Sequence, residues 1–134
     1  MSQIIQSQIV KGTNNDERIF ARLDVEVSWQ DSVSGQKRKV TGNTVNIGSS
    51  SAFVSIHTLP PVGEPVSLRI FKGDKELLLT KARVIRVERD PAKPKAALNI
   101  EKDFSKWKDE VIPAAQDWVS NDIKLNYEGD DWLN

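Results

Sequence analysis

The chain has 134 residues, of which 38% are hydrophobic and 28% are charged, and its net charge is zero. This length fits one domain with a single core, and this composition excludes a disordered chain and a membrane protein. The absence of cysteine excludes disulfides, thiolate nucleophiles and Cys-ligated metal sites, and the single His57 is too little for a multi-histidine site. No basic segment or long apolar run opens the chain, so we expect no signal peptide, no membrane insertion and a cytoplasmic location.

Alternation of apolar and polar residues predicts a series of short strands. Val25, Val27 and Trp29 share one face of the first of them. Residues 60–65 hold three prolines and are expected to form a loop, because proline removes a donor from the strand ladder. Short strands with frequent turns predict an all-β antiparallel barrel or sandwich. The strands are expected near residues 24–29, 39–46, 52–56, 66–70, 77–87 and 96–100.

The pattern changes to helical spacing after Asp103, which predicts a C-terminal amphipathic helix. Asp103 or Ser105 is expected to cap its start, and Pro113 predicts a kink or a division into two short helices. Its apolar face is expected to contain Phe104, Trp107, Val111, Ala115, Trp118 and Val119. We divide the chain into an N-terminal arm (1–15), a barrel domain with its C-terminal helix (16–119) and an acidic tail (120–134).

Charge is unevenly distributed along the chain. Residues 69–102 carry ten basic and five acidic side chains, and residues 103–134 carry three basic and eight acidic ones. One interpretation is an acidic C-terminal part packed or solvated beside a basic barrel. The other is a basic face that attracts an anionic ligand, with an acidic tail that competes for it or binds a partner.

The sequence offers no catalytic constellation. Ser49, Ser50 and Ser51 lack the Gly-x-Ser-x-Gly context of a nucleophile elbow. His57 is interpreted as an exposed or structural histidine, and the carboxylates are scattered through turns and the tail. We therefore expect a binding module and not an enzyme.

Two short segments carry more chemistry. Arg18 and Arg22, four residues apart before the first strand, present two planar guanidinium groups that suit phosphate oxygens and guanine edges. Residues 42–54 place Asn46 and a run of small residues between two strands, where a flat base can approach the backbone and an amide can pair with its edge. Taken singly, the arginines also suit a barrel rim and the second segment also suits an ordinary turn.

Together these segments resemble the PilZ domain family. That family pairs an R-x-x-x-R motif with a later D/N-x-S-x-x-G motif on a six-stranded antiparallel β-barrel, often followed by a C-terminal helix. Arg18 and Arg22 match the first motif, and Asn46 opens the second. The resemblance covers roughly residues 16–119 and implies a six-stranded PilZ-type barrel with a C-terminal amphipathic helix.

The chain departs from the second motif at two positions. Gly48 stands where the family has serine, and Ser51 stands where it has glycine. The first change removes a hydroxyl. The second costs about 1 kcal/mol or more if the backbone at position 51 needs a positive φ. Both changes predict a weakened ligand site.

The resemblance implies a signalling effector or adaptor that binds cyclic di-GMP, a ligand that often binds as a stacked pair, and then acts on an unidentified protein target. Control of motility, adhesion or exopolysaccharide is the family's usual output. The arm over residues 12–22 is expected to be mobile until the ligand orders it. The implied ligand-binding residues are Arg18, Arg22, Asn46, Gly48, Ser49 and Ser51, with no cofactor and no metal.

Two alternatives stay open. The degenerate second motif suits a PilZ-like adaptor that has lost the nucleotide and works by protein contacts only. In that case Trp107, Trp118 or Trp132 would anchor a partner, although Trp107 and Trp118 are more simply read as closing the barrel. A small barrel that binds oligonucleotides or sugars is the third class, but the neutral overall charge makes nucleic-acid binding unlikely.

Overall fold

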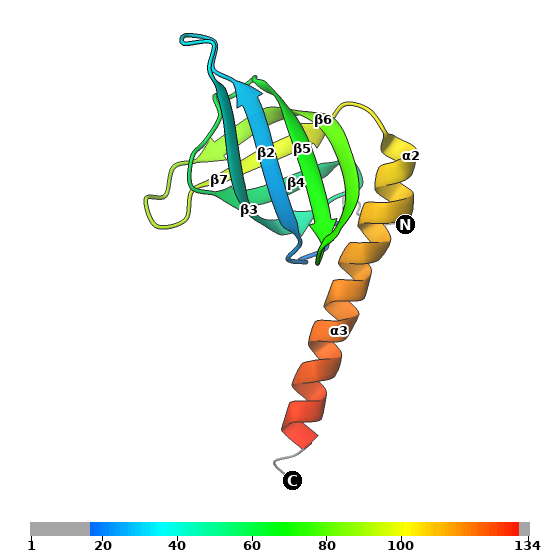
Figure 1. Cartoon of the computed structure of the whole chain (residues 1–134). Coiled ribbons are helices and arrows are strands. Elements are labelled where there is room, and N and C mark those ends of the chain that lie inside the picture. The colour runs from blue at the N-terminus through cyan, green and yellow to red at the C-terminus, as the bar shows by residue number, and fades with distance from the viewer. Residues whose placement is uncertain (1–16, 132–134) are drawn as a thin grey trace, which may run out of the picture.

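The computed structural model of the chain describes residues 17–131, with the side chains of residues 17–123. The predicted arm (1–15) and Trp132 therefore lie outside the described residues. Six strands close into an antiparallel barrel in the order β2-β3-β4-β7-β6-β5 (Figure 1). The all-β, six-stranded barrel is thus confirmed, with each strand within a few residues of its expected bounds. The strands are β2 (Asp24–Gln30), β3 (Lys37–Ile47), β4 (Ser51–Ile56), β5 (Pro65–Lys72), β6 (Lys75–Glu88) and β7 (Lys95–Ile100).

Side chains alternate between the two faces of each strand, and those that point inward fill the inside of the barrel and form the core. Val27, Val54 and Leu68 are fully buried there, as the period of two dictates. The register shifts once in β3, between Thr44 and Asn46, and again in β5 and β6. Such bulges bend strands and increase their twist, which helps a short sheet close on itself.

Gly42 marks the closest approach between β3 and β4. A β-carbon at this position would lie 2.0 Å from the carbonyl oxygen of Ser55. Only glycine therefore allows these two strands to pair at this point.

One continuous helical segment follows the barrel. It consists of α2 (Phe104–Lys106), a π-helical turn η1 (Trp107–Val111) and α3 (Ile112–Asp131). In the π turn the Ile112 N–H donates to the carbonyl oxygen of Trp107, so the wider turn directly precedes Pro113. The helix is therefore not divided into two at Pro113. It also continues to Asp131, so the stretch that we expected to be a tail after residue 119 is helical up to that point.

The helix begins at the predicted position, although the cap itself differs from the prediction. Asp103 precedes the first turn with φ 62°, and its side chain makes no capping hydrogen bond. Its carboxylate instead accepts a hydrogen bond of 2.9 Å from the buried Thr80 hydroxyl of β6. The contact ties the start of the helix to the barrel.

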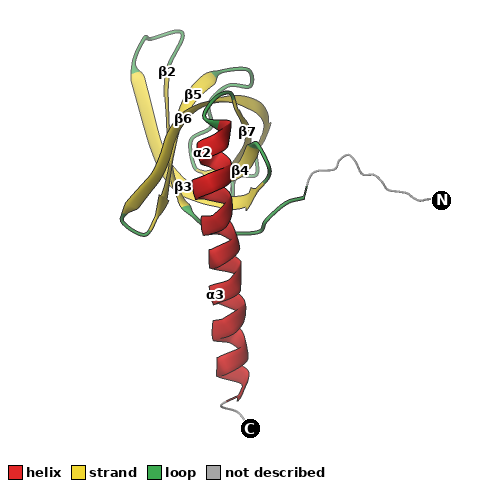
Figure 2. Ribbon diagram, turned by 90° about the vertical axis from the view of Figure 1, so that its right-hand side faces the viewer, coloured by secondary structure: helices red, strands yellow, loops and turns green. Residues whose placement is uncertain are grey.

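The first turns of the helix close one side of the barrel, and the rest of α3 projects beyond it (Figures 1 and 2). Trp107 is fully buried, and the half-buried Trp118 packs against the core. Both tryptophans therefore serve the core, as the simpler of the two interpretations predicts. Lys72 at the end of β5 pairs with Asp117 of α3 at 2.5 Å. No helix among the described residues is long and apolar enough to cross a membrane.

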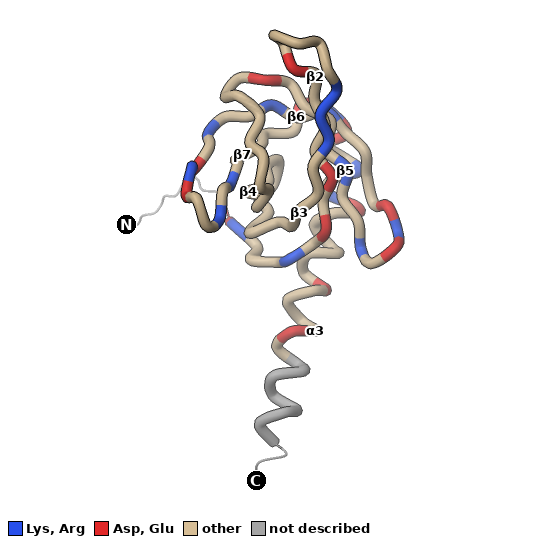
Figure 3. Tube along the Cα trace, turned by 60° about the vertical axis from the view of Figure 1, so that its left-hand side comes forward, with Lys and Arg blue, Asp and Glu red and all other residues tan. Residues whose placement is uncertain are grey.

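Along the Cα trace of the barrel, Lys and Arg positions are interspersed with Asp and Glu positions (Figure 3). The arginines of the basic 69–102 segment are largely paired: Arg69 with Glu26 and Glu76, Arg83 with Glu101, and Arg86 with Glu88. Of these carboxylates only Glu26 lies outside the segment, so the other pairs leave its excess of five positive charges unchanged. Glu26, and Asp117 as the partner of Lys72, offset part of that excess. An anion site has to come from particular residues rather than from the overall field.

Candidate nucleotide-binding site

The arginine segment (residues 18–22) lies against the end of β3. Ile19 exchanges two backbone hydrogen bonds with Ile47, of 2.8 and 2.9 Å. The buried Thr44 hydroxyl donates to the Ala21 carbonyl oxygen at 2.6 Å and accepts from the Leu23 N–H at 2.8 Å. The prediction of a mobile arm is therefore wrong for the part from residue 19 onward, because main-chain pairing and buried side chains hold it to the barrel.

Arg18 joins the two motifs. Its Nε donates to Oδ1 of Asn46 at 2.8 Å, and its Nη1 donates to Oγ of Ser51 at 2.5 Å. Both acceptors come from the second motif, on β3 and β4. The tertiary structure thus brings together three of the residues that the resemblance implied, across sequence separations of 28 and 33 residues.

Gly48 makes room for that arginine. A β-carbon at position 48 would lie 2.1 Å from Nη1 of Arg18 and 2.8 Å from Oγ of Ser51. The two departures from the family motif therefore form a matched pair: Ser51 supplies an acceptor for Arg18, and Gly48 leaves the space that its guanidinium occupies. Ser51 does not have a positive φ, so the expected backbone strain at this position is absent.

The other two implied ligand residues are Arg22, from the first motif, and Ser49, from the span of the second. Arg22 is exposed and makes no hydrogen bond or ion pair with another described residue. Ser49 is exposed on the turn between β3 and β4, next to Gly48. Arg22 is therefore accessible to a ligand, while Arg18 is half-buried and already held in place.

The outer face of the sheet continues from Asn46 across three strands. The register sets Asn46 beside Phe53, Phe53 beside Ala97, and Ala97 beside Arg86. The Arg86 guanidinium carbon lies 5.0 Å from the centre of the Phe53 ring, a cation–π contact. A flat row with an aromatic ring next to the arginine site is a suitable platform for a purine.

Gly48 also connects the cluster to the C-terminal helix. The buried indole Nε1 of Trp107 donates to the Gly48 carbonyl oxygen at 3.0 Å. The helical spacing of the sequence identified Trp107 as a core residue, but it carried no signal for this bond to a glycine 59 residues earlier. The turn of the second motif is therefore held between Arg18 on one side and the helix on the other.

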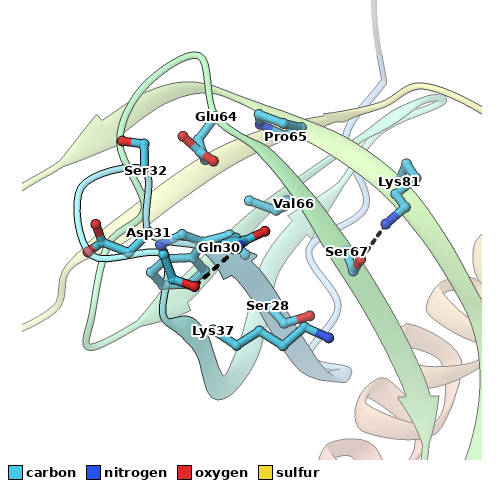
Figure 4. A pocket seen from close by; sticks show the side chains of 12 residues that line it. Ser28, Gln30, Asp31, Ser32, Lys37, Glu64, Pro65, Val66, Ser67 and Lys81 are labelled. Carbon is cyan, nitrogen blue, oxygen red and sulfur yellow. Dashed lines mark hydrogen bonds between the residues drawn. The ribbon is translucent and has the colours of Figure 1, made fainter.

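A separate cleft opens beside the β2–β3 hairpin (Figure 4). Ser28, Lys37, Ser67 and Lys81 line it, with Lys81 Nζ bonded to Ser67 Oγ at 2.9 Å. Asp31 lies at its edge, and the N–H groups of Ser34 and Val33 lower the pKa of that carboxyl. None of the implied ligand residues lines this cleft. Among the described residues, no group of three or more acidic or histidine side chains is placed to hold a metal ion.

Comparison with known proteins gives no match to any family model and none to a curated protein. Solved structures do match. The TM-score is 0.55 with the Bacillus subtilis inhibitor of motility MotI/DgrA, at 18% identity over 91% of this chain and 54% of that one. It is 0.56 with Escherichia coli YcgR in complex with c-di-GMP, at 9% identity over 90% and 50% of the two chains.

The isolated PilZ domain of YcgR with c-di-GMP matches over nearly its whole length. The TM-score is 0.54 at 10% identity, over 87% of this chain and 97% of that one. By contrast, the chain spans about half the length of the MotI/DgrA and complete YcgR structures. At such low identities the likeness concerns the fold, and on that ground the chain has the β-barrel fold of PilZ domains.

Proposed function

We propose that the chain is a non-enzymatic effector that binds cyclic di-GMP and signals to a protein partner in the cytoplasm. The single observation that carries this proposal is the position of Arg18, which hydrogen-bonds to Asn46 and Ser51 and so assembles both motifs into one site. The fold likeness to the c-di-GMP-bound PilZ domain of YcgR supports the same ligand.

In this site Arg22 is the group that a ligand meets first. Its exposed guanidinium suits a phosphate or the O6/N7 edge of guanine. Asn46 Oδ1 and the Phe53 ring next to it supply an acceptor and a stacking surface. Because the arginine segment is already paired with β3, the ligand has little backbone to order, which lowers the entropic cost of binding.

A second candidate function is that of an adaptor without the nucleotide. The observation that favours it is the same contact: Asn46 and Ser51 already accept hydrogen bonds from Arg18, so a ligand must compete with them for those donors. Gly48 contributes no hydroxyl where the family motif has one. In this case the output would depend on protein contacts alone.

Isothermal titration of cyclic di-GMP into the full chain separates the two functions. We expect saturable binding that Arg22→Ala weakens by about tenfold to a hundredfold, the effect of a lost charge-assisted pair. Arg38→Ala is the matched control, because Arg38 is exposed on the β2–β3 hairpin and, within the part of the chain that the structure describes, its ion pair is with Asp31. If millimolar cyclic di-GMP produces neither heat nor chemical-shift changes, the chain does not bind the nucleotide. That result would contradict the first function and support the second, an adaptor that works by protein contacts alone.

A further inference from the structure

A cleft next to Gly48 is lined by residues of the arginine segment and of the C-terminal helix. We call it the arm–helix cleft, and it has a volume of about 610 Å³. Volumes of about 300–1,000 Å³ are usual for small-molecule sites. Figure 2 shows the segment that precedes β2 passing beside the helix at this point. The residues used below are Glu17, Ile19, Ser49, Phe104, Lys108 and Ile112, all of which line the cleft.

The lining combines an apolar floor with one aromatic ring and one cation. Ile19 from the arginine segment and Ile112 from the helix are half-buried and line the cleft. Phe104 is 54% exposed at the start of the helix, so its ring is accessible to a ligand in the cleft. Lys108, one turn later, is exposed and makes no ion pair with another described residue. An aromatic face stacks on a base, and an ammonium group binds a phosphate.

The cleft adjoins the two-motif site directly. Gly48 lines the cleft, and the Arg18 guanidinium occupies the space where a β-carbon of Gly48 would lie. A cyclic dinucleotide has two bases and two phosphates, so one half can contact the arginines while the other half reaches past the 48–49 turn. Lys108 and the neighbouring Arg18 outweigh the single carboxylate of Glu17, so the local charge favours an anion.

We propose that the arm–helix cleft binds one base and the adjacent phosphate of the cyclic dinucleotide, with Phe104 stacked on the base and Lys108 paired with the phosphate. This inference rests on the proposed function and assigns to the helix a part in binding that neither sequence motif contains. It also gives the exposed ring of Phe104 a role, because a ligand would cover it.

The test is titration of cyclic di-GMP into the full-length wild type and four variants. Lys108→Ala and Phe104→Ala are each expected to weaken binding by about tenfold, through loss of a charge-assisted contact and of base stacking. Lys108→Arg should keep most of the affinity. Glu17→Gln should bind more tightly, because it removes the one carboxylate. The effect of Lys108→Ala should shrink at high salt, where charges are screened.

Lys106→Ala is the matched control, because Lys106 lies on the same helix but does not line the cleft. The melting temperature of each variant is measured as a check on folding. We expect it to be unchanged, because Phe104 and Lys108 are both exposed. Suppose that Lys108→Ala and Phe104→Ala both bind with wild-type affinity, while Arg22→Ala still loses binding. That result would overturn the proposal that the cleft binds the ligand, and it would leave the proposed function intact. A wild type that binds no cyclic di-GMP would instead overturn the proposed function itself.

Discussion

The guanidinium of Arg18 occupies the space that a side chain at position 48 would fill. The distance from Nη1 of Arg18 to an ideal β-carbon on Gly48 is 2.1 Å, well inside van der Waals contact. Glycine at this position and arginine at position 18 therefore depend on each other, although 29 residues separate them in the sequence. The dependence accounts for one departure from the family motif and makes it testable.

Gly48→Ala is expected to displace the Arg18 side chain from Asn46 and Ser51. The free energy of unfolding should fall by about 1–2 kcal/mol, because hydrogen bonds to a charged group are lost at a half-buried site. A double-mutant cycle with Arg18→Ala, followed by urea unfolding, measures the coupling. In the Arg18→Ala background the same glycine substitution should cost clearly less, and equal costs in both backgrounds would contradict the packing argument.

Ser51→Ala removes the acceptor for Nη1 of Arg18 but leaves Asn46 in place. We expect the Arg18 side chain to become more mobile on the nanosecond timescale, while the barrel loses no more than about 1 kcal/mol. The ¹⁵N relaxation of the Arg18 Nε–H group measures this directly. Ser55→Ala, on the same strand, should leave that signal unchanged. A rigid Arg18 in the Ser51→Ala protein would show that Asn46 alone holds it.

Trp107→Phe keeps an aromatic ring at a fully buried position and deletes the indole donor. The carbonyl oxygen of Gly48 then loses its hydrogen bond in a buried environment, and a small cavity forms. We expect a loss of about 1–3 kcal/mol in the free energy of unfolding, measured by circular dichroism in urea. The half-buried Trp118 serves as the comparison, and Trp118→Phe should cost less. The reverse order would show that the bond to Gly48 contributes little.

Two glycines test two different physical reasons for the same residue type. Gly42→Ala places a methyl group 2.0 Å from the carbonyl oxygen of Ser55, so it must push β3 away from β4. We expect it to destabilise the barrel by about 1–3 kcal/mol and to broaden the amide signals of both strands. Gly35→Ala has open space around it but a positive φ of 74°, and should cost about 1 kcal/mol with only local shifts. Similar spectra for the two variants would refute the steric explanation for Gly42.

The amino-acid sequence by itself determined the strands and their inward faces. Residues such as Val25, Val27 and Trp29 reveal a strand because alternation is a local property, readable over a few positions. The start of the helix at Asp103 and the burial of Trp107 were accessible for the same reason. Its continuation to Asp131 was missed, although Ile123 and Tyr127 follow Val119 at the helical spacing of four, because the acidic residues of this stretch suggested a tail.

The tertiary structure decided how the candidate site works. The contacts of Arg18 with Asn46 and Ser51, and of Trp107 with Gly48, join residues 28, 33 and 59 positions apart. No local pattern encodes such pairs, because barrel closure and helix docking create them. For this reason the sequence shows Gly48 and Ser51 only as two departures from a motif. In the structure Gly48 leaves room for the Arg18 guanidinium and Ser51 accepts its hydrogen bond, so the two departures belong together.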